Sequence, residues 1–495
     1  MNRLAVINVV GLTESLIGEH TPRIAEFRKR GALANIVPAF PAVTCTAQSN
    51  YLTGATPSQH GIVGNGWFNR ELAEVQFWKQ SNHLVQQPKI WDALRKQSEI
   101  VNRKSSIANC FWWFNMYSTA DYSITPRPMY PADGRKIFDI YTWPYSIRTE
   151  IKKDLGEFPF FGFWGPAAGI NTPRASADCA TRWIAESAKW IENKFSPALN
   201  LIYLPHLDYD LQRHGPFVVA ADVSRLTSII GNKKEPAHAG CYEVNPKIHR
   251  DLHEIDVIVG DLIKFFGQRG VQVVLLSEYG ITNVDTPVHL NRLFRQKGWL
   301  AVKEELGLEI LDAGASKVFA VADHQAAHIY LNDVSLEKSV REVLEKTPGV
   351  EKVLGDAEKS VAGIDHPRAG DLIAVAREDA WFTYYYWLDD ARAPDFARTV
   401  DIHRKPGYDP VELFLDPKIP LPKLKIAWRL LQKKLGFRIL MDVVPLDATL
   451  VKGSHGRCPA DKRDWPVFIT ERPDILGTKE IESTDVCQIL RWHWE

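Results

Sequence analysis

Short apolar runs and amphipathic segments alternate along the first part of the chain. Continuous apolar stretches at 4–10, 199–204 and 271–276 predict buried strands, because such a run requires cover on both faces of a sheet. A shorter stretch at 32–37 predicts another strand. A glycine, a proline or a serine follows each of the three long stretches and marks the end of the strand.

Two helices are predicted between these strands. Residues 23–30 follow Thr21 and Pro22, which provide an N-cap and a proline at the first helical position, and the helix ends at Gly31. A second, longer helix is predicted from 246 to 266. Its apolar face consists of Ile248, Leu252, Ile255, Val259 and Leu262. Apolar strands alternating with helices predict an α/β fold with a parallel sheet covered on both faces.

The pattern changes at about residue 321. Strand-like segments at 323–331, 371–375 and 381–387 surround a helix-like segment at 335–347 and predict a small α+β insertion. We therefore predict a core at 1–320, an inserted subdomain at 321–440 and a C-terminal return to the core at 441–495. His324 and His328 would share one face of the first of these strands and serve in packing.

The composition of the chain mainly excludes certain classes of partner and of protein. The chain has 495 residues, of which 60 are Lys or Arg and 60 are Asp or Glu, so its overall charge favours neither a nucleic acid polymer nor an anionic membrane as a partner. No apolar window is long enough to span a bilayer, and the six cysteines form no CxxC pair. We expect a cytoplasmic protein with reduced thiols and no membrane partner. Residues 426–435 predict an amphipathic basic helix, for which we favour a solvated face over a membrane anchor.

Candidate chemistry lies where the predicted strands end. In parallel sheets, ligands bind outside the carboxyl ends of the strands, so the junctions after Val10, Val43, Leu204 and Leu276 should meet. Thr44 follows one of these junctions. An alcohol at a helix start lies beside free N–H groups that favour an anion, which suits attack on a phosphate or sulfate ester. The alternative is an ordinary helix-capping threonine.

Three short elements in this region point to a known family. Thr44, Leu52-Thr53-Gly54 and His60-Gly61-Ile62 resemble the nucleophile region of the type I phosphodiesterase/nucleotide pyrophosphatase family of the alkaline phosphatase superfamily. The resemblance implies an alkaline-phosphatase-like fold, hydrolysis of phosphoric or phosphonic esters or anhydrides, a small phosphorylated substrate, and Thr44 as the nucleophile. The family's phosphate-binding Asn falls on Ala47, and we expect the neighbouring Gln48 to contact substrate.

The resemblance also implies two zinc ions, which the aligned positions match in part. Val10 stands where the family has an Asp, and Glu278-Tyr279 stands where it has Asp-His. The family's Asp-x-x-x-His element falls either on Asp208 and Gln212 or on Asp210 and His214, and the sequence leaves both registers open. The family's late His falls on His455. Candidate ligands of a divalent ion, taken as zinc with one or two ions bound, are Asp208, Asp210, His214, Glu278 and His455.

An aromatic run at 109–117, followed by a basic, proline-rich segment, offers a second candidate surface. Trp112 could stack a base and Arg127 could hold a phosphate; an aromatic edge of the core is the competing interpretation. Three hypotheses follow for the whole chain. It is a hydrolase with an altered metal site, a metal-independent enzyme that uses Thr44, or a catalytically inactive binding protein. The retained residues at the strand ends favour an enzyme.

Overall fold

The computed structural model describes residues 2–92, 95–96, 105–132, 136–164, 179–219 and 242–493. Cys241 lies outside these residues. Cys45, Cys110, Cys458 and Cys487 are free thiols. In the described parts of the chain, no helix has the length and apolar character needed to cross a membrane.

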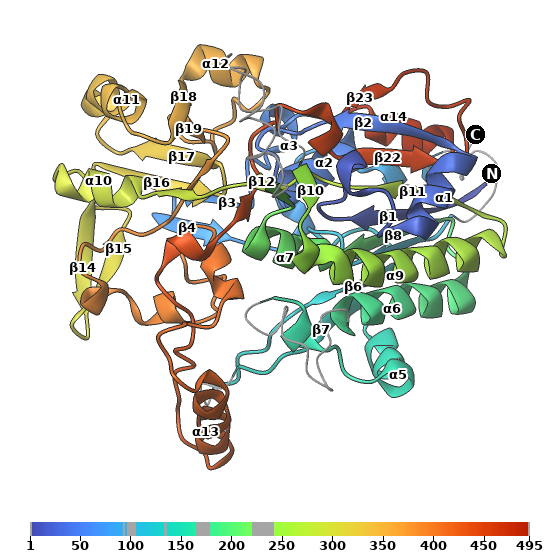
Figure 1. Cartoon of the computed structure of the whole chain (residues 1–495), viewed down its shortest axis with the longest axis horizontal. Coiled ribbons are helices and arrows are strands. Elements are labelled where there is room, and N and C mark those ends of the chain that lie inside the picture. Colours follow the sequence, from blue (N-terminus) through green and yellow to red (C-terminus); the bar gives the residue numbers. More distant parts are fainter. Residues whose placement is uncertain are drawn as a thin grey trace, which may run out of the picture.

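A central sheet of nine described strands organises the molecule, in the order β23-β2-β22-β11-β1-β8-β5-β6-β7 (Figure 1). Their bounds are β1 (Arg3–Val9), β2 (Ala32–Val37), β5 (Ile107–Cys110), β6 (Tyr122–Pro126), β7 (Ile140–Trp143), β8 (Leu199–Leu204), β11 (Val271–Leu276), β22 (Val467–Thr470) and β23 (Glu480–Glu482). Strands β11, β1, β8, β5 and β6 are parallel, and Ile7 pairs with both Leu275 and Ile202. The predicted α/β class and the four predicted strands are confirmed.

The sheet departs from the all-parallel expectation at β22 and β7. Strand β22 runs antiparallel between β2 and β11, and β7 runs antiparallel to β6. An apolar stretch predicts burial but does not encode strand direction, because direction depends on the connection that precedes the strand. The segment before β22 returns from the distant second part of the molecule rather than through a helical crossover.

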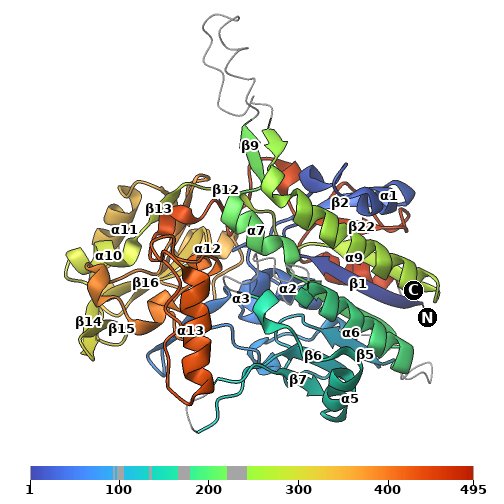
Figure 2. The ribbon, with the colours of Figure 1, turned by 60° about the horizontal axis from the view of Figure 1, so that its bottom comes forward.

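Helices cover both faces of the sheet. Helices α1 (Pro22–Arg30), α6 (Cys179–Phe195) and α9 (His249–Gly267) form a layer on one face, and α2 (Thr44–Thr53) packs with α14 (Val486–Trp492) on the other (Figures 1 and 2). Helix α7 (His206–His214) contacts α9, while α5 (Ser146–Leu155) packs beside α6 and α3 (Pro57–His60) beside α2. A 3-10 turn at Pro246–Ile248 precedes α9, so the predicted long helix begins three residues later.

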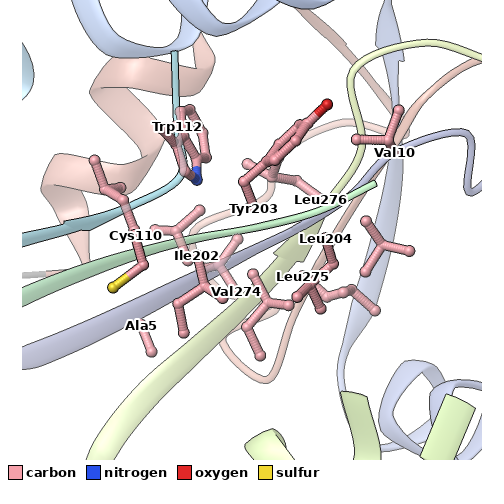
Figure 3. Packing of buried hydrophobic residues seen from close by; sticks show 14 of the residues in the cluster. Ala5, Val10, Cys110, Trp112, Ile202, Tyr203, Leu204, Val274, Leu275 and Leu276 are labelled. Atoms are coloured by element: carbon pink, nitrogen blue, oxygen red, sulfur yellow. The ribbon is translucent and has the colours of Figure 1, made fainter. Parts of the chain in front are cut away.

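The core between these layers is largely apolar along the strands. Figure 3 shows Trp112 beside Cys110 and Tyr203, with Leu275 and Leu276 farther along the sheet. Val10 follows β1 and is fully buried. The continuous apolar runs of the sequence are therefore explained by a sheet that is covered on both faces.

The second part of the molecule has its own antiparallel sheet, in the order β16-β17-β19-β18. Its main elements are β16 (Val318–Asp323), β17 (Ala326–Leu331), β18 (Val350–Leu354), β19 (Leu372–Ala376), α10 (Leu290–Gln296), α11 (Glu337–Glu345) and α12 (Asp356–Val361). The apolar core of this part includes residues from Val284 to Val451, together with Phe68 and Phe77. This core draws on both sides of positions 321 and 440, and the division into domains remains a prediction.

The shorter strands form separate two-stranded pairs. They are the pairs β3 (Gly66–Asn69) with β4 (Glu74–Phe77), β9 (Phe217–Val219) with β10 (Tyr242–Val244), β12 (Thr282–Asn283) with β21 (Gly453–Ser454), β13 (Thr286–Val288) with β20 (Ala380–Phe382), and β14 (Ala301–Glu305) with β15 (Leu308–Asp312). Helix α13 (Pro422–Lys434) begins four residues before the predicted start at 426 and lies apart from both sheets (Figure 1).

Two strand predictions in the second part are wrong. The stretch 323–331 is divided by a turn at His324 and Gln325, where His324 has a φ of +62°. His324 and His328 therefore do not share one strand face. The predicted strand at 381–387 ends at Phe382, because the aromatic side chains that follow pack as irregular chain in the second core. Aromatic residues favour strands but equally fill a core without regular structure.

Candidate active site

Thr44 lies at the carboxyl edge of the central sheet. It is the first residue of α2, after the extended Val43, and its residue surface is 3% exposed. Its hydroxyl lies 3.3 Å from the hydroxyl of Tyr279, which follows β11. The structure therefore brings together the junctions after β8 and β11 with the start of α2, as the rule for parallel sheets predicts.

A chain of hydrogen bonds leads away from Thr44. The Tyr279 hydroxyl donates to Asp208 Oδ1 at 3.1 Å, so Thr44 must donate to Tyr279 rather than accept from it. Gln212 Nε2 donates to Asp208 Oδ2 at 2.9 Å. The Tyr408 hydroxyl donates to Gln212 Oε1 at 3.0 Å. Burial raises the pKa of Asp208 to about 7, although the bonds from Tyr279 and Gln212 oppose that rise.

Glu278 forms the other wall of this site and is fully buried. Its Oε1 accepts hydrogen bonds from Asn8 at 2.6 Å and from Gln48 at 2.5 Å, whereas Oε2 has no hydrogen bond among the described residues. Burial raises the pKa of Glu278 to about 8, against the lowering effect of its hydrogen bonds to Gln48 and Asn8. Near neutral pH this carboxyl group holds its proton.

His455 lies against the same network. Its Nδ1 donates to the backbone oxygen of Ala42 at 2.7 Å, and its Nε2 lies 4.0 Å from Asp208 Oδ1 with no hydrogen bond to the described chain. The ring stacks on Tyr279, with 3.6 Å between centroids and 7° between planes. Burial lowers the pKa of His455 to about 3, so the imidazole is neutral.

His324 is a site residue that sequence reasoning missed. Its ring lies 3.6 Å from the rings of both His455 and Tyr408, measured between centroids. The error follows from placing His324 inside a strand, because the turn directs its ring toward the network instead. A titratable pair at a strand end, Asp323 and His324, is the signal that could have identified it.

The structure distinguishes the two registers that the sequence left open. Asp208 and Gln212 are four residues apart on α7 and share the face that meets Tyr279. Asp210 and His214 point elsewhere: Asp210 pairs with Arg213 at 2.6 Å, and His214 lies 3.9 Å from Asp210. The structure thus does not bring Asp210 or His214 to Thr44, because half a helical turn separates Asp210 from Asp208.

A different group of ligand-type atoms lies between α7, which provides His206, and α9, which provides Asp251 and Glu254. Atoms of His206, Asp251 and Glu254 lie within 4.8 Å of one another, and within the ranges described this is the sole group of three such residues. Arg250 donates to Glu254 Oε1 at 2.7 Å. The acidic neighbour Asp210 helps burial to raise the pKa of Asp251. None of these residues faces the Thr44 network.

The residues around Thr44 do not fit a centre of two zinc ions. Structural and catalytic zinc sites use three or four protein ligands from Cys, His, Asp or Glu. At the first position, Val10 has no donor atom, and burial holds the pKa of the Tyr279 phenol well above its usual value, which leaves Thr44 and Glu278. At the second position, Gln212 replaces the His, which leaves Asp208 and His455, and both oxygens of Asp208 accept hydrogen bonds from neutral groups.

The predicted substrate-binding residues lie in three different environments. Gln48 is inside the site, but it holds Glu278 and accepts a bond from the Trp113 backbone N–H at 2.6 Å. Trp112 is fully buried in the core near Tyr203 (Figure 3). Arg127 is exposed, and its guanidinium lies 3.4 Å from the Met116 sulfur. The structure does not bring Trp112 and Arg127 together at Thr44.

A small cavity of about 10 Å³ adjoins the network at Tyr408. Its lining includes Trp78 and Trp164, whose rings approach Tyr408 at 6.0 and 5.7 Å between centroids. Lys405, also in the lining, pairs with Asp409 and Glu412 at 2.7 Å each. Aromatic faces beside a buried ion-pair cluster therefore separate the network from solvent on this side.

Known proteins share this fold at low sequence identity. Phosphonoacetate hydrolase from Sinorhizobium meliloti 1021, in complex with phosphonoformate, is 13% identical with a TM-score of 0.57, and the match covers 100% of this chain and 96% of that one. An inactive murine ectonucleotide pyrophosphatase/phosphodiesterase 5, in complex with AMP, is 13% identical with a TM-score of 0.54, over 99% and 95% of the two chains. These similarities confirm the alkaline-phosphatase-like fold.

Sequence comparison gives the family. An uncharacterized pyrophosphatase/phosphodiesterase of Schizosaccharomyces pombe is 22% identical over 281 residues, which is 55% of this chain and 42% of the relative, so the match spans less than half of that protein. The model of the family described as type I phosphodiesterase/nucleotide pyrophosphatase matches residues 4–409, most of the chain. The chain therefore belongs to the type I phosphodiesterase/nucleotide pyrophosphatase family.

Proposed function

We propose that this protein cleaves a phosphoric or phosphonic ester or anhydride of a small molecule, with Thr44 Oγ1 as the attacking atom. The observation that carries the proposal is the hydrogen-bonded series from Thr44 through Tyr279 to Asp208. Family membership supports the class of reaction. The relatives that bind AMP and phosphonoformate support a small phosphorylated or phosphonylated substrate.

The first step removes the proton of Thr44. Thr44 donates its proton to the Tyr279 oxygen while Tyr279 passes its own proton to Asp208, so the phenol stays neutral throughout. A base with a pKa of about 7 is ionised in half of the molecules at neutral pH, which suits Asp208 to this role. The Oγ1–phosphorus bond forms as the bond from phosphorus to the leaving oxygen breaks.

Glu278 is suited to the opposite role. It holds a proton near neutral pH, and its Oε2 is unpaired and buried beside Thr44. It donates this proton to the leaving oxygen, and the N-terminus of α2 favours the charge on the phosphoryl group. In the second half-reaction water attacks phosphorus, gives its proton to Glu278, and Thr44 leaves with the proton held by Asp208.

These steps need no resident metal, in agreement with the poor fit of the site to two zinc ions. They also preserve the balance of protons, because each carboxyl group returns to its first state after one cycle. The proposal differs from the family pattern in using buried acids and a phenol where metal ions would neutralise the phosphoryl oxygens.

A binding protein without turnover is the second candidate function. Thr44 is 3% exposed, and the tyrosine and glutamine side chains satisfy the hydrogen bonds of Asp208 from within the protein. Such closure suits a site that holds a ligand without reacting with it. Val10 and Tyr279, which replace ligand-type residues, support the same interpretation.

Turnover of bis-p-nitrophenyl phosphate in the presence of a chelator tests the proposal. We expect Thr44→Ala to lower kcat by roughly 1,000-fold or more, and Thr44→Ser to retain part of the rate because it keeps the hydroxyl. Acid quenching during turnover should trap a phosphoryl group on the Thr44 peptide, detected by mass spectrometry. Full activity of Thr44→Ala would overturn the nucleophile assignment, and chelator-resistant binding without any turnover would favour the binding protein.

A further inference from the structure

Helix α13 exposes apolar side chains instead of burying them. Leu424, Trp428 and Leu431 follow one another at helical spacing and are 63%, 57% and 46% exposed. Leu421 before the helix and Leu435 after it extend the same stripe and are 62% and 65% exposed. No residue of α13 is buried. We call these five residues the α13 stripe.

The polar side of α13 faces the protein. Lys425 Nζ donates to Asp442 Oδ2 at 2.8 Å, and Arg429 Nη2 donates to Asp442 Oδ1 at 3.1 Å. Both basic residues are less exposed than the stripe, with side chains 28% and 30% accessible. The helix is therefore inverted relative to an ordinary surface helix, whose apolar face packs inward.

The charge of this segment is strongly one-sided. Residues 418–441 contain seven basic residues and no acidic ones, although Lys+Arg and Asp+Glu are equal over the whole chain. The seven are Lys418, Lys423, Lys425, Arg429, Lys433, Lys434 and Arg438. On a helical projection, Lys425 and Arg429 border one edge of the α13 stripe and Lys423 and Lys434 the other.

The position of α13 leaves the stripe open. Figure 1 shows α13 at the lower edge of the molecule, beyond both sheets and away from the layer formed by α6 and α9. The segment after it adds Phe437 and Leu440, which are 64% and 43% exposed. Residues 421–440 therefore expose many large apolar side chains, and large exposed apolar patches commonly mark interaction sites.

We propose that α13 lies in the surface of a lipid bilayer that contains anionic headgroups, with its stripe among the acyl chains. Apolar residues with a tryptophan, bordered by long cationic side chains, match the two layers of such a surface. A second copy of the chain is a poorer occupant, because pairing two stripes would bring two cationic borders together. The sequence predicts a solvated basic helix here, and α13 is exposed; the proposal adds a membrane partner that the sequence does not predict.

Co-sedimentation of the full chain with vesicles tests the proposal. We expect binding to phosphatidylcholine vesicles that contain phosphatidylglycerol, and binding weaker by about tenfold or more to phosphatidylcholine alone. Leu424→Ser with Trp428→Ser should abolish binding to both. Lys433→Glu with Lys434→Glu should remove the preference for anionic vesicles. Leu72→Ser, at a leucine 59% exposed on the β3–β4 hairpin, should bind as the wild type does.

Three results would overturn the inference. The first is failure of the wild type to sediment with anionic vesicles. The second is unchanged vesicle binding by the Leu424→Ser, Trp428→Ser variant, which thermal unfolding would show to be folded. The third is a dimer in sedimentation velocity without lipid that the same variant dissociates, together with no vesicle binding; this result would assign the stripe to a second copy. None of these measurements depends on turnover at Thr44.

Discussion

The network around Thr44 and the α13 stripe both depart from the usual distribution of polar residues outside and apolar residues inside, but in opposite directions. The network buries Asp208, Glu278 and His455, whereas α13 exposes leucine and tryptophan side chains. Burying an ionisable group costs free energy unless hydrogen bonds replace water, and exposing apolar surface forgoes the stabilisation that burial gives. Both regions are therefore costly to the isolated fold.

The two regions differ in where compensation comes from. In the network, the Tyr279 hydroxyl and the Gln212 amide each donate a hydrogen bond to one oxygen of Asp208. The protein itself therefore replaces the water that this buried carboxylate has lost. On α13 no residue is buried, and the side chains of the stripe remain 46–65% exposed. The first region should respond to changes in its own hydrogen bonds, and the second to what is added from outside. Further predictions for the network test this contrast.

The largest effect is expected for Tyr279→Phe. This change removes the hydroxyl that links Thr44 to Asp208 but keeps the ring that stacks on His455. Because the relay then lacks its middle oxygen, we expect kcat to fall by about 100-fold or more. Steady-state kinetics with bis-p-nitrophenyl phosphate measures this decrease in kcat.

Tyr386→Phe is the matched control. Tyr386 is also fully buried and its hydroxyl donates to the backbone oxygen of Glu309 at 3.3 Å, but it belongs to the second core. Loss of this hydroxyl should leave kcat within about twofold of the wild-type value, because a substitution in the core far from the site acts mainly on stability. Equal kcat values for Tyr279→Phe and the wild type would contradict proton transfer through Tyr279.

A smaller effect is expected from the pH dependence of Glu278→Gln. If the acid form of Glu278 is required, kcat of the wild type falls as pH rises through about 8, the pKa to which burial raises this group. In the variant, kcat should not fall over this alkaline range. At pH 7 its kcat should be about tenfold lower than that of the wild type, because an amide is a poor acid. An unchanged alkaline limb in Glu278→Gln would exclude Glu278 as the acid.

The same group predicts a dependence of stability on pH. A folded pKa of about 8 against an ordinary value of 4.5 means that the contribution of Glu278 is fully present below 4.5 and is lost as pH rises through 8. The wild type should therefore lose free energy of unfolding relative to Glu278→Gln over this interval, by at most ~5 kcal/mol. Urea unfolding of both proteins at pH 5 and pH 8.5 measures the difference.

Much of the fold could be predicted from the sequence. The strands at 199–204 and 271–276 match β8 and β11, because a long apolar run leaves few alternatives to a buried strand. The direction of β22 and the turn at His324 could not be predicted. Both depend on contacts between segments far apart in the chain, which local apolar patterns do not encode.

The candidate site was predictable in its location but not in its chemistry. The rule for parallel sheets and the resemblance at Thr44 indicated the right junctions. The partners of Asp208 could not be read from spacing, because Tyr279 and Tyr408 come from different parts of the chain and meet α7 only in the folded state. The exposure of α13 could not be predicted for a related reason: a helical pattern shows that one face is apolar but not whether that face meets the protein.

Tyr408→Phe should have the smallest effect on kcat, and it tests how far from Asp208 the hydrogen bonds still influence catalysis. Tyr408 donates to Gln212 Oε1, and three hydrogen bonds separate its hydroxyl from that of Tyr279. Its loss leaves that amide oxygen unpaired, which should lower the free energy of unfolding by about 1–3 kcal/mol. Because Gln212 still donates to Asp208, kcat should change by only about twofold to fivefold. A loss as large as that of Tyr279→Phe would mean that the hydrogen bonds act as one cooperative unit, so that the base is tuned from the second core and not by its immediate neighbours alone.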